Sequence, residues 1–207
     1  MTGLWLFTDM AVAVLTAQLK TLAHLVDQRV SLTMLCATAA SALAMLACAH
    51  LSTFTGRRTF FTAFGALSTV TSPPLTYLAV FHQHAPASLL VLVVLLEVAT
   101  VPVYGPVAAY LTEHFPPGVR SSGYGLAYSL SIIAPALYPY YLPPLQRALG
   151  TEPAVAALLA LAGVLTVLGA AGAPTIGVGQ STNISESSLS AFTVPNPTTA
   201  TPPRERP

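Results

Sequence analysis

Charged side chains are scarce in this chain of 207 residues. Only 7% of the residues are Asp, Glu, Lys or Arg, whereas a typical soluble domain has about 25%. A soluble protein of this length needs a charged surface, so the composition excludes an ordinary water-soluble globule. The hydrophobic fraction of 54% instead favours a chain whose main solvent is the lipid bilayer.

The residues that make up several familiar kinds of site are also missing. The formal net charge is +1 and there is no basic stripe, which excludes nucleic acid as a partner. Cys36 and Cys48 share one apolar run, where thiols pack as small hydrophobic groups. No spacing of Cys and His matches a metal site, and neither a nucleophile elbow nor a phosphate-binding loop occurs. We therefore expect no enzymatic activity, no metal and no cofactor.

Six apolar stretches are long enough to cross a membrane as helices. They predict an all-α integral membrane protein whose membrane domain covers residues 1–173, with spans near residues 3–25, 31–51, 59–81, 88–112, 122–142 and 153–173. The first span is the weakest, because Asp9 and Lys20 lie within it and ionisable groups are costly in hydrocarbon.

The basic residues predict an orientation, since cytoplasmic loops carry an excess of Lys and Arg. With six spans, one side holds Arg57, Arg58, Arg120, Arg204 and Arg206, and the other holds Lys20, Arg29 and Arg147. We therefore expect a multi-pass protein of the plasma (inner) membrane with both termini in the cytoplasm. Residues 174–207, rich in Ser, Thr and Pro, predict a disordered cytoplasmic tail.

Glu97 is the strongest candidate for a functional side chain. It falls near the middle of the fourth predicted span, where an ionised carboxylate costs on the order of a few kcal/mol. Such a group usually faces a cavity, pairs with a cation or is protonated, and a buried carboxyl can carry a proton. The alternative is a neutral Glu97 that is hydrogen-bonded to a neighbouring helix.

Prolines interrupt two of the predicted spans. They are Pro73 and Pro74 in the third span, and Pro135 and Pro139 in the fifth. Each removes a backbone hydrogen bond, so these helices are expected to kink or unwind. Broken helices line substrate sites in transporters, whereas an ordinary kink only improves packing, and the sequence does not decide between the two. Tyr104 and Tyr128 are the better candidates for lining a path.

A polar hairpin separates the fourth and fifth predicted spans. Its residues fit the pattern Glu-x-Phe-Pro-x-x-Val-Arg-x-x-Gly-x-Gly-x-x-Tyr through Glu113, Phe115, Pro116, Val119, Arg120, Gly123, Gly125 and Tyr128. Because Pro116 and Pro117 cannot continue a helix, the fourth span is expected to end near Glu113 and the fifth to begin near Ser121. This turn is expected to bring Glu113 and Arg120 close enough to pair.

The hairpin resembles the second-half signature of major facilitator superfamily transporters. The likeness is greatest to the metabolite:proton symporters, which include the proline/betaine and α-ketoglutarate permeases. Residues 49–58 are also similar to the Gly-x-Leu-Ser-Asp-Arg-x-Gly-Arg-Arg loop of that family, through Leu51, Ser52, Gly56, Arg57 and Arg58. The acidic position is Thr53 here and the following basic position is Phe54, so the charge pairing of that loop with neighbouring helix ends is expected to be partly lost.

The resemblance implies a six-helix bundle that corresponds to the C-terminal half of a twelve-helix transporter, as a truncated, split or remnant product. It implies transport of a small polar solute or organic acid by proton-coupled symport and alternating access. The cytoplasmic gate would comprise Gly56, Arg57, Arg58, Glu113, Pro116, Arg120, Gly123 and Gly125, and the path would comprise Glu97, Tyr104 and Tyr128. The expected partners are membrane lipids, the solute, protons, and an N-terminal transporter half or a second copy of the chain.

The alternative hypothesis is a non-transporting membrane protein that binds a membrane partner through helix faces of small residues. Ala40, Ala44 and Cys48 recur every four residues in the second predicted span, and Ala156 and Ala160 begin a similar face in the sixth. Such faces allow close helix contact in lipid. Alanine is abundant throughout the chain, so we interpret both faces as packing surfaces.

Overall fold

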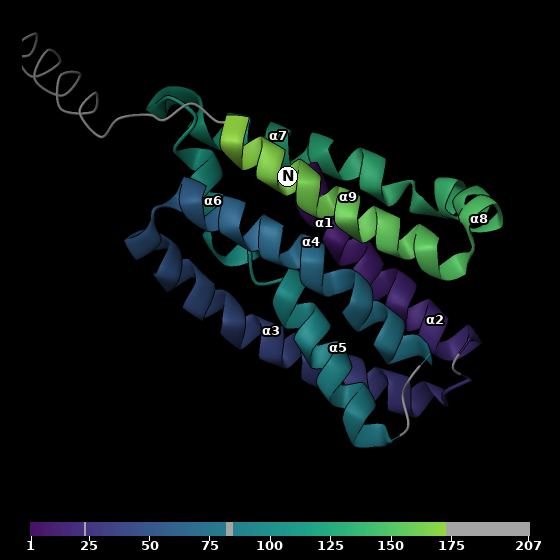
Figure 1. The fold of residues 1–207 in the computed structure, drawn as a ribbon. Coiled ribbons are helices and arrows are strands. Elements are labelled where there is room, and N and C mark those ends of the chain that lie inside the picture. Colours follow the sequence, from purple (N-terminus) through teal and green to yellow (C-terminus); the bar gives the residue numbers. More distant parts are fainter. Residues whose placement is uncertain (23, 82–84, 173–207) are drawn as a thin grey trace, which may run out of the picture. The chain divides into compact units, whose positions relative to one another are not determined.

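The computed structural model describes residues 1–22, 24–81 and 85–172, and this part consists of helices joined by short connections (Figure 1). The elements in chain order are α1 (Thr2–Thr8), the π-helix η1 (Asp9–Val14), α2 (Leu15–Thr21), α3 (Asp27–Thr55), α4 (Arg57–Phe81), α5 (Pro86–Thr100), α6 (Tyr104–Thr112), the 3-10 turn η2 (Pro117–Val119), α7 (Arg120–Ala136), α8 (Tyr138–Leu149) and α9 (Thr151–Gly172). These ranges contain no strand, which confirms the all-α class. The predicted tail, residues 174–207, lies outside the described residues.

Four helical stretches in this described part are long and apolar enough to cross a membrane. They are Thr2–Thr21, Asp27–Thr55, Ala87–Thr112 and Thr151–Gly172, and they coincide with the first, second, fourth and sixth predicted spans. The third predicted span is α4, which has 25 residues. Its hydroxyl side chains and its Pro73-Pro74 pair make α4 less apolar than the other four.

The fifth predicted span, residues 122–142, is divided into two helices rather than being one. α7 ends at Ala136 and α8 begins at Tyr138. The cause is Pro139, which has no N–H to donate to the carbonyl of Pro135 one turn earlier. The Tyr141 hydroxyl donates to the Pro135 carbonyl instead, at 3.2 Å.

A second break was not predicted from the sequence. It interrupts the fourth predicted span between α5 and α6, at residues 101–103. Pro106 cannot donate to the carbonyl of Pro102, which accepts from the Gly105 amide in a tight turn at 3.0 Å. Pro102 itself cannot continue the ladder of α5.

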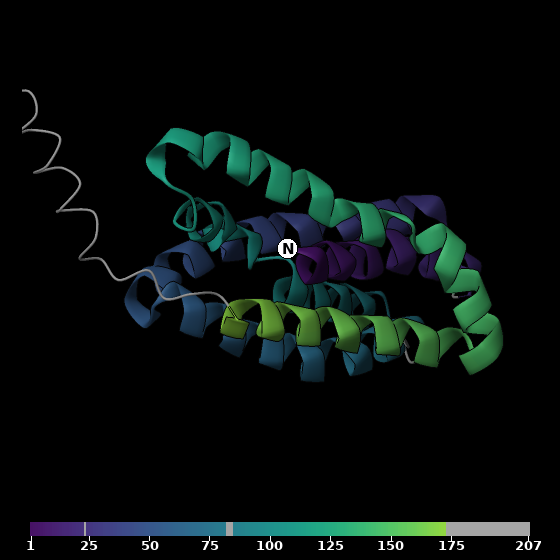
Figure 2. The ribbon, with the colours of Figure 1, turned by 90° about the horizontal axis from the view of Figure 1, so that it is seen from above.

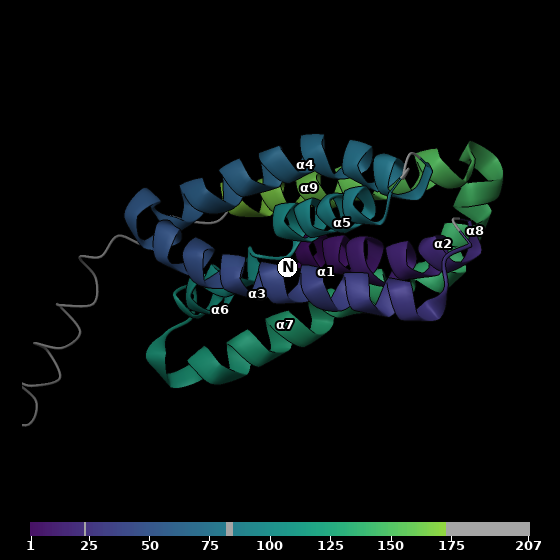
Figure 3. The same ribbon diagram turned by 90° about the horizontal axis from the view of Figure 1, so that it is seen from below.

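The segment α1–η1–α2 lies in the middle of the bundle. Figures 2 and 3 show α4 and α9 side by side at one edge and α7 at the opposite edge, with α1 between α9 and α7. Phe7, Met10 and Leu15 on this segment are fully buried.

α3, in contrast, exposes large apolar side chains: Leu32, Leu43 and Leu46 are 61%, 70% and 71% exposed. An apolar exterior of this kind suits contact with lipid.

α4 and α9 make the most extensive helix contact among the described residues, and glycines permit it. A side-chain carbon on Gly163 would overlap the Thr69 hydroxyl and lie 3.0 Å from the Gly65 carbonyl. A side-chain carbon on Gly65 would lie 3.0 Å from Val167. The two backbones therefore approach to a distance that any larger residue would prevent.

We expect Gly163→Ala to destabilise the protein by about 1–3 kcal/mol, because the added methyl group overpacks this contact. The measurement is the free energy of unfolding in detergent micelles, by denaturant titration. Gly169→Ala is the matched control on the same helix, since nothing lies within 4 Å of its added carbon. It should stay within about 0.5 kcal/mol of wild type. Equal effects of the two substitutions would contradict the close contact.

Candidate functional site

Glu97 lies inside the bundle, on the side of α5 that faces α3. It is 1% exposed, and the hydroxyls of Thr38 and Ser41 lie beside its carboxylate. The Ser41 hydroxyl is 3.5 Å from Oε2 of Glu97 and only 3.0 Å from the carbonyl of Thr38, so its contact with the carboxylate is the weaker one. The other oxygen, Oε1, is buried and accepts no hydrogen bond from the described residues. Glu97 is therefore held by hydroxyl groups and has no paired cation in this part of the chain.

Tyr104 and Tyr128, the two tyrosines predicted to line a path, meet at the same side chain. Trp5 of α1 makes edge-to-face contacts with Tyr104 and with Tyr128, at ring-centroid distances of 5.7 and 5.2 Å. Thr8, one turn further along α1, is hydrogen-bonded to the Tyr104 hydroxyl at 3.2 Å. Aromatic rings in this arrangement attract each other through their quadrupoles. The tyrosines thus form an aromatic cluster with Trp5 and Thr8 between α1, α6 and α7.

Two polar atoms near this cluster have no hydrogen-bond partner among the described residues. They are the indole Nε1 of Trp5 and the carboxylate Oδ2 of Asp9, which are one turn apart on the same helical segment. Asp9 begins the π-helix η1, a distortion that occurs frequently at functional sites. A buried donor and a buried acceptor that are left unpaired can each bind a polar ligand.

Sequence reasoning missed Trp5, Thr8 and Asp9 as site residues. Asp9 was visible as an acidic residue in an apolar segment, and the same physical argument that selected Glu97 applies to it. The same residue also helps to make the first span the least apolar of the four helical stretches that can cross a membrane, which hides its role. The structure places this span in the most enclosed position of the bundle.

Glu97 and the aromatic cluster are not in contact through any described hydrogen bond. The carboxylate of Glu97 faces α3, whereas the aromatic cluster lies between α1, α6 and α7. They are connected along the chain, because Glu97 lies one turn before the break at residues 101–103 and Tyr104 lies directly after it. A change in the backbone conformation of residues 101–103 would therefore move both Glu97 and Tyr104.

The two loop motifs meet at one end of the bundle. Nε of Arg57 lies 3.1 Å from Oε1 of Glu113, which joins the start of α4 to the end of α6. Arg58 donates to the carbonyl of Ala171 at 2.5 Å, near the end of α9. The Arg57 NH1 group is buried without a partner among the described residues. Both arginines of the first motif thus hold helix ends together.

The expected pair between Glu113 and Arg120 is wrong. Glu113 pairs with Arg57, and Arg120 donates from Nε to the carbonyl of Phe115 at 3.4 Å. The reason is that η2 occupies the hairpin and α7 starts at Arg120, while the start of α4 supplies a guanidinium beside Glu113. A planar guanidinium is well suited to a carboxylate at a helix end.

The small residues of the motifs have distinct structural roles. Gly56 has φ +81° and ends α3, a backbone conformation that favours glycine. Pro116 directly precedes the 3-10 turn η2 and is exposed. A side-chain carbon on Gly123 would lie 2.5 Å from the Phe115 ring, which packs on this glycine. Gly125 faces open space, and nothing in the structure explains why this position is a glycine.

The small-residue face predicted on the second span, Ala40, Ala44 and Cys48, is half-buried, and the residues buried most deeply on α3 are others. Ala37 and Ser41 are buried against α5, and Cys48 packs against a core cluster that includes Val103. Ala40 and Ala44 are half-buried, as are Ala156 and Ala160 on α9. A side-chain carbon on Gly105 would overlap the Met45 carbonyl, so α6 also approaches α3 closely.

The described residues contain no group of three or more His, Cys, Asp or Glu side chains that could hold a metal ion. Comparison with protein-family models, with curated proteins and with solved structures finds no match. The likeness to the major facilitator superfamily therefore depends on the residues of the two loop motifs themselves.

A double-mutant cycle tests the Arg57–Glu113 pair. With Arg57→Gln and Glu113→Gln, we expect a coupling of about 0.2–1 kcal/mol in the free energy of unfolding, as for other partly exposed ion pairs. The matched cycle with Arg120→Gln and Glu113→Gln should give a coupling near zero. A larger coupling to Arg120 than to Arg57 would show that the hairpin pairs within itself.

Gly123→Ala and Gly125→Ala form a second matched pair of substitutions. The methyl group on Gly123 would displace the Phe115 ring from α7, and we expect a loss of about 1–3 kcal/mol in the free energy of unfolding. Gly125→Ala should have little effect, because its surroundings are open. If Gly123→Ala is as mild as Gly125→Ala, Phe115 does not pack on α7 as described.

Proposed function

We propose that this chain is the C-terminal half of a proton-coupled solute transporter of the major facilitator superfamily. The observation that carries the proposal is Glu97, a carboxylate that is 1% exposed in an apolar bundle. It has no cation beside it among the described residues. Ionisable groups in such positions are costly, and in membrane proteins they mark ion and proton pathways. In this proposal Glu97 takes up and releases the transported proton.

The proposed solute path runs along the aromatic cluster of Trp5, Thr8, Tyr104 and Tyr128. The cluster lies beside a discontinuous helix, and transporters build solute sites from such helices because unwound backbone groups are free to bind. The unpaired carboxylate of Asp9 and the indole N–H of Trp5 supply an acceptor and a donor beside the cluster. The solute is a small polar molecule or an organic acid, as the resemblance implies.

The Arg57–Glu113 ion pair is the proposed cytoplasmic gate. It ties the α3–α4 connection to the end of α6, and opening to the cytoplasm requires it to separate. The chain is then a multi-pass protein of the plasma (inner) membrane with its termini on the side of Arg57, Arg58 and Arg120. An N-terminal half, or a second copy of this chain, completes the path, because alternating access needs two halves that rock against each other.

Glu97→Gln should abolish proton-driven accumulation of solute, since it keeps the shape of the side chain and removes the titratable group. The measurement is uptake of radiolabelled proline, glycine betaine and 2-oxoglutarate into proteoliposomes under an inward proton gradient. The chain is reconstituted alone and together with a candidate N-terminal half. Asp27→Asn, which removes an exposed carboxylate of α3, is the control and should retain uptake.

The transporter proposal fails if neither preparation accumulates any of these solutes, or if uptake does not depend on Glu97. Cooperative thermal unfolding of the Glu97→Gln protein shows that a loss of uptake is not a loss of structure. The proton gradient is collapsed with a protonophore in parallel, and only the wild-type uptake should respond.

A second candidate function is binding of a membrane partner without transport. Its support is α7, in which Pro135 is the single buried residue. Ser121, Gly125 and Ser129 are exposed at intervals of four residues on this helix, and such spacing permits close approach of another helix in lipid. This function predicts a stable complex with a membrane partner that shows no solute flux in the same proteoliposomes.

A further inference from the structure

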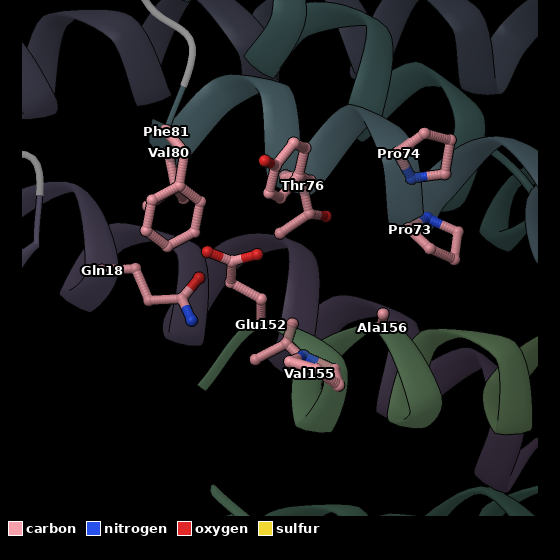
Figure 4. Close-up of a pocket in the computed structure, with 11 residues that line it drawn as sticks. Gln18, Pro73, Pro74, Thr76, Val80, Phe81, Glu152, Val155 and Ala156 are labelled. Atoms are coloured by element: carbon pink, nitrogen blue, oxygen red, sulfur yellow. The ribbon is translucent and has the colours of Figure 1, made fainter. Parts of the chain in front are cut away.

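A pocket of about 320 Å³ opens between α2, α4 and α9 (Figure 4). It lies at the Phe81 end of α4, far from the Arg57–Glu113 pair at the other end of that helix. Its volume is at the lower end of the range for small-molecule sites, about 300–1,000 Å³. The pocket is separate from Glu97 and from the aromatic cluster, neither of which contributes a lining residue.

The walls of this pocket are mostly apolar. They include Pro73, Val80, Phe81, Val155 and Ala156. Polar side chains from three different helices also line this space: Gln18 from α2, Thr76 and Tyr77 from α4, and Glu152 from α9 (Figure 4). An apolar cavity with a few convergent polar groups is the usual form of a small-molecule site.

Two polar groups of the pocket, the Gln18 amide and the Glu152 carboxylate, make no hydrogen bond to a described residue, whereas the Thr76 hydroxyl donates to the carbonyl of Ser72 at 3.0 Å. Gln18 is only 6% exposed, yet its amide makes no hydrogen bond to a described residue. Glu152 likewise has no hydrogen bond and no ion pair in the described part of the chain, where Lys20 is already paired with Asp27 at 2.9 Å. A buried amide normally finds a partner, so Gln18, left open in a cavity beside the half-buried carboxylate of Glu152, points to a bound molecule.

The charge of the pocket defines what kind of molecule fits. Glu152 supplies one negative charge, and none of the described residues that line the pocket is Lys, Arg or His. An anion would be repelled, and a neutral molecule would leave the carboxylate without a counter-charge. A cation would be attracted by Glu152 and by the face of the Phe81 ring, while its apolar part would contact the prolines and Val155.

We propose that this pocket binds a small organic cation, an ammonium group on a short apolar body. The ammonium group lies at the Glu152 carboxylate, and the Gln18 amide and Thr76 hydroxyl accept its remaining hydrogen bonds. The apolar body fills the space between α4 and α9. The site does not depend on the proposed transport function, because binding requires neither Glu97 nor a second transporter half.

The test uses benzylamine as the probe, with the full chain in lipid nanodiscs. Binding of radiolabelled benzylamine is measured by equilibrium dialysis, and benzyl alcohol and benzoate serve as neutral and anionic probes of nearly the same shape. We expect saturable binding of benzylamine and none of benzoate. Glu152→Gln should raise the Kd by about tenfold or more, since it removes a charge-assisted hydrogen bond.

Two further variants and one control make the test specific to the pocket. Gln18→Leu should weaken binding several-fold, and Ala156→Phe should abolish it by filling the cavity. Gln146→Leu is the matched control for Gln18→Leu, an amide outside the pocket, and should leave the Kd unchanged. If Glu152→Gln fails to unfold cooperatively, Ala156→Phe still decides whether the probe occupies this cavity.

The proposal is overturned if benzyl alcohol binds as tightly as benzylamine, because the pocket then takes apolar molecules or lipid chains without regard to charge. Unchanged benzylamine binding in either Glu152→Gln or Ala156→Phe would place the probe elsewhere. Loss of solute uptake in the Glu97→Gln protein has no bearing on these outcomes, so the two proposals succeed or fail separately.

Discussion

The contact between α4 and α9 is the constraint on which the other features of the bundle depend. Gly163 and Gly65 let the two backbones approach so closely that Thr69 fills the remaining space. One end of this helix pair is fixed by the hydrogen bond from Arg58 to Ala171. At the other end the helices diverge enough to leave the pocket that contains Glu152. The Arg58–Ala171 hydrogen bond and the pocket therefore lie at opposite ends of one helix pair.

Most hydroxyl groups in the interior are satisfied within their own helix. The donors Ser68, Ser72, Thr76, Thr100 and Thr166 each bond to the carbonyl four residues earlier, at 2.6 to 3.0 Å. This arrangement suits a helix in lipid, where water cannot supply partners. Against this background the unpaired oxygens of Glu97 and Asp9 and the indole N–H of Trp5 are exceptions. Groups that the protein does not satisfy are the ones available to a proton or a solute.

Much of the fold could be predicted from the sequence, because length and apolarity are properties of a single segment. The four helical stretches that can cross a membrane follow from these alone. The partner of Glu113 could not be predicted, because it depends on where α4 begins relative to α6 and not on distance along the hairpin. The sequence predicts Tyr104 and Tyr128 but not the aromatic cluster, since the two tyrosines come together through Trp5, which precedes them by 99 and 123 residues in the chain.

The prolines explain why helix breaks were harder to place than helices. Pro73 and Pro74 lie within α4, which continues to Phe81, whereas Pro102 and Pro139 accompany real interruptions. The two interruptions differ in the group that donates to the carbonyl that the proline cannot reach. At Pro139 the Tyr141 hydroxyl donates to the carbonyl of Pro135. At the other interruption the Gly105 amide donates to the carbonyl of Pro102 in a tight turn. These replacement hydrogen bonds depend on the three-dimensional arrangement of the chain, so the composition of a segment does not predict them. The break beside Pro102 matters most, because it places a buried carboxylate before the interruption and the aromatic cluster after it.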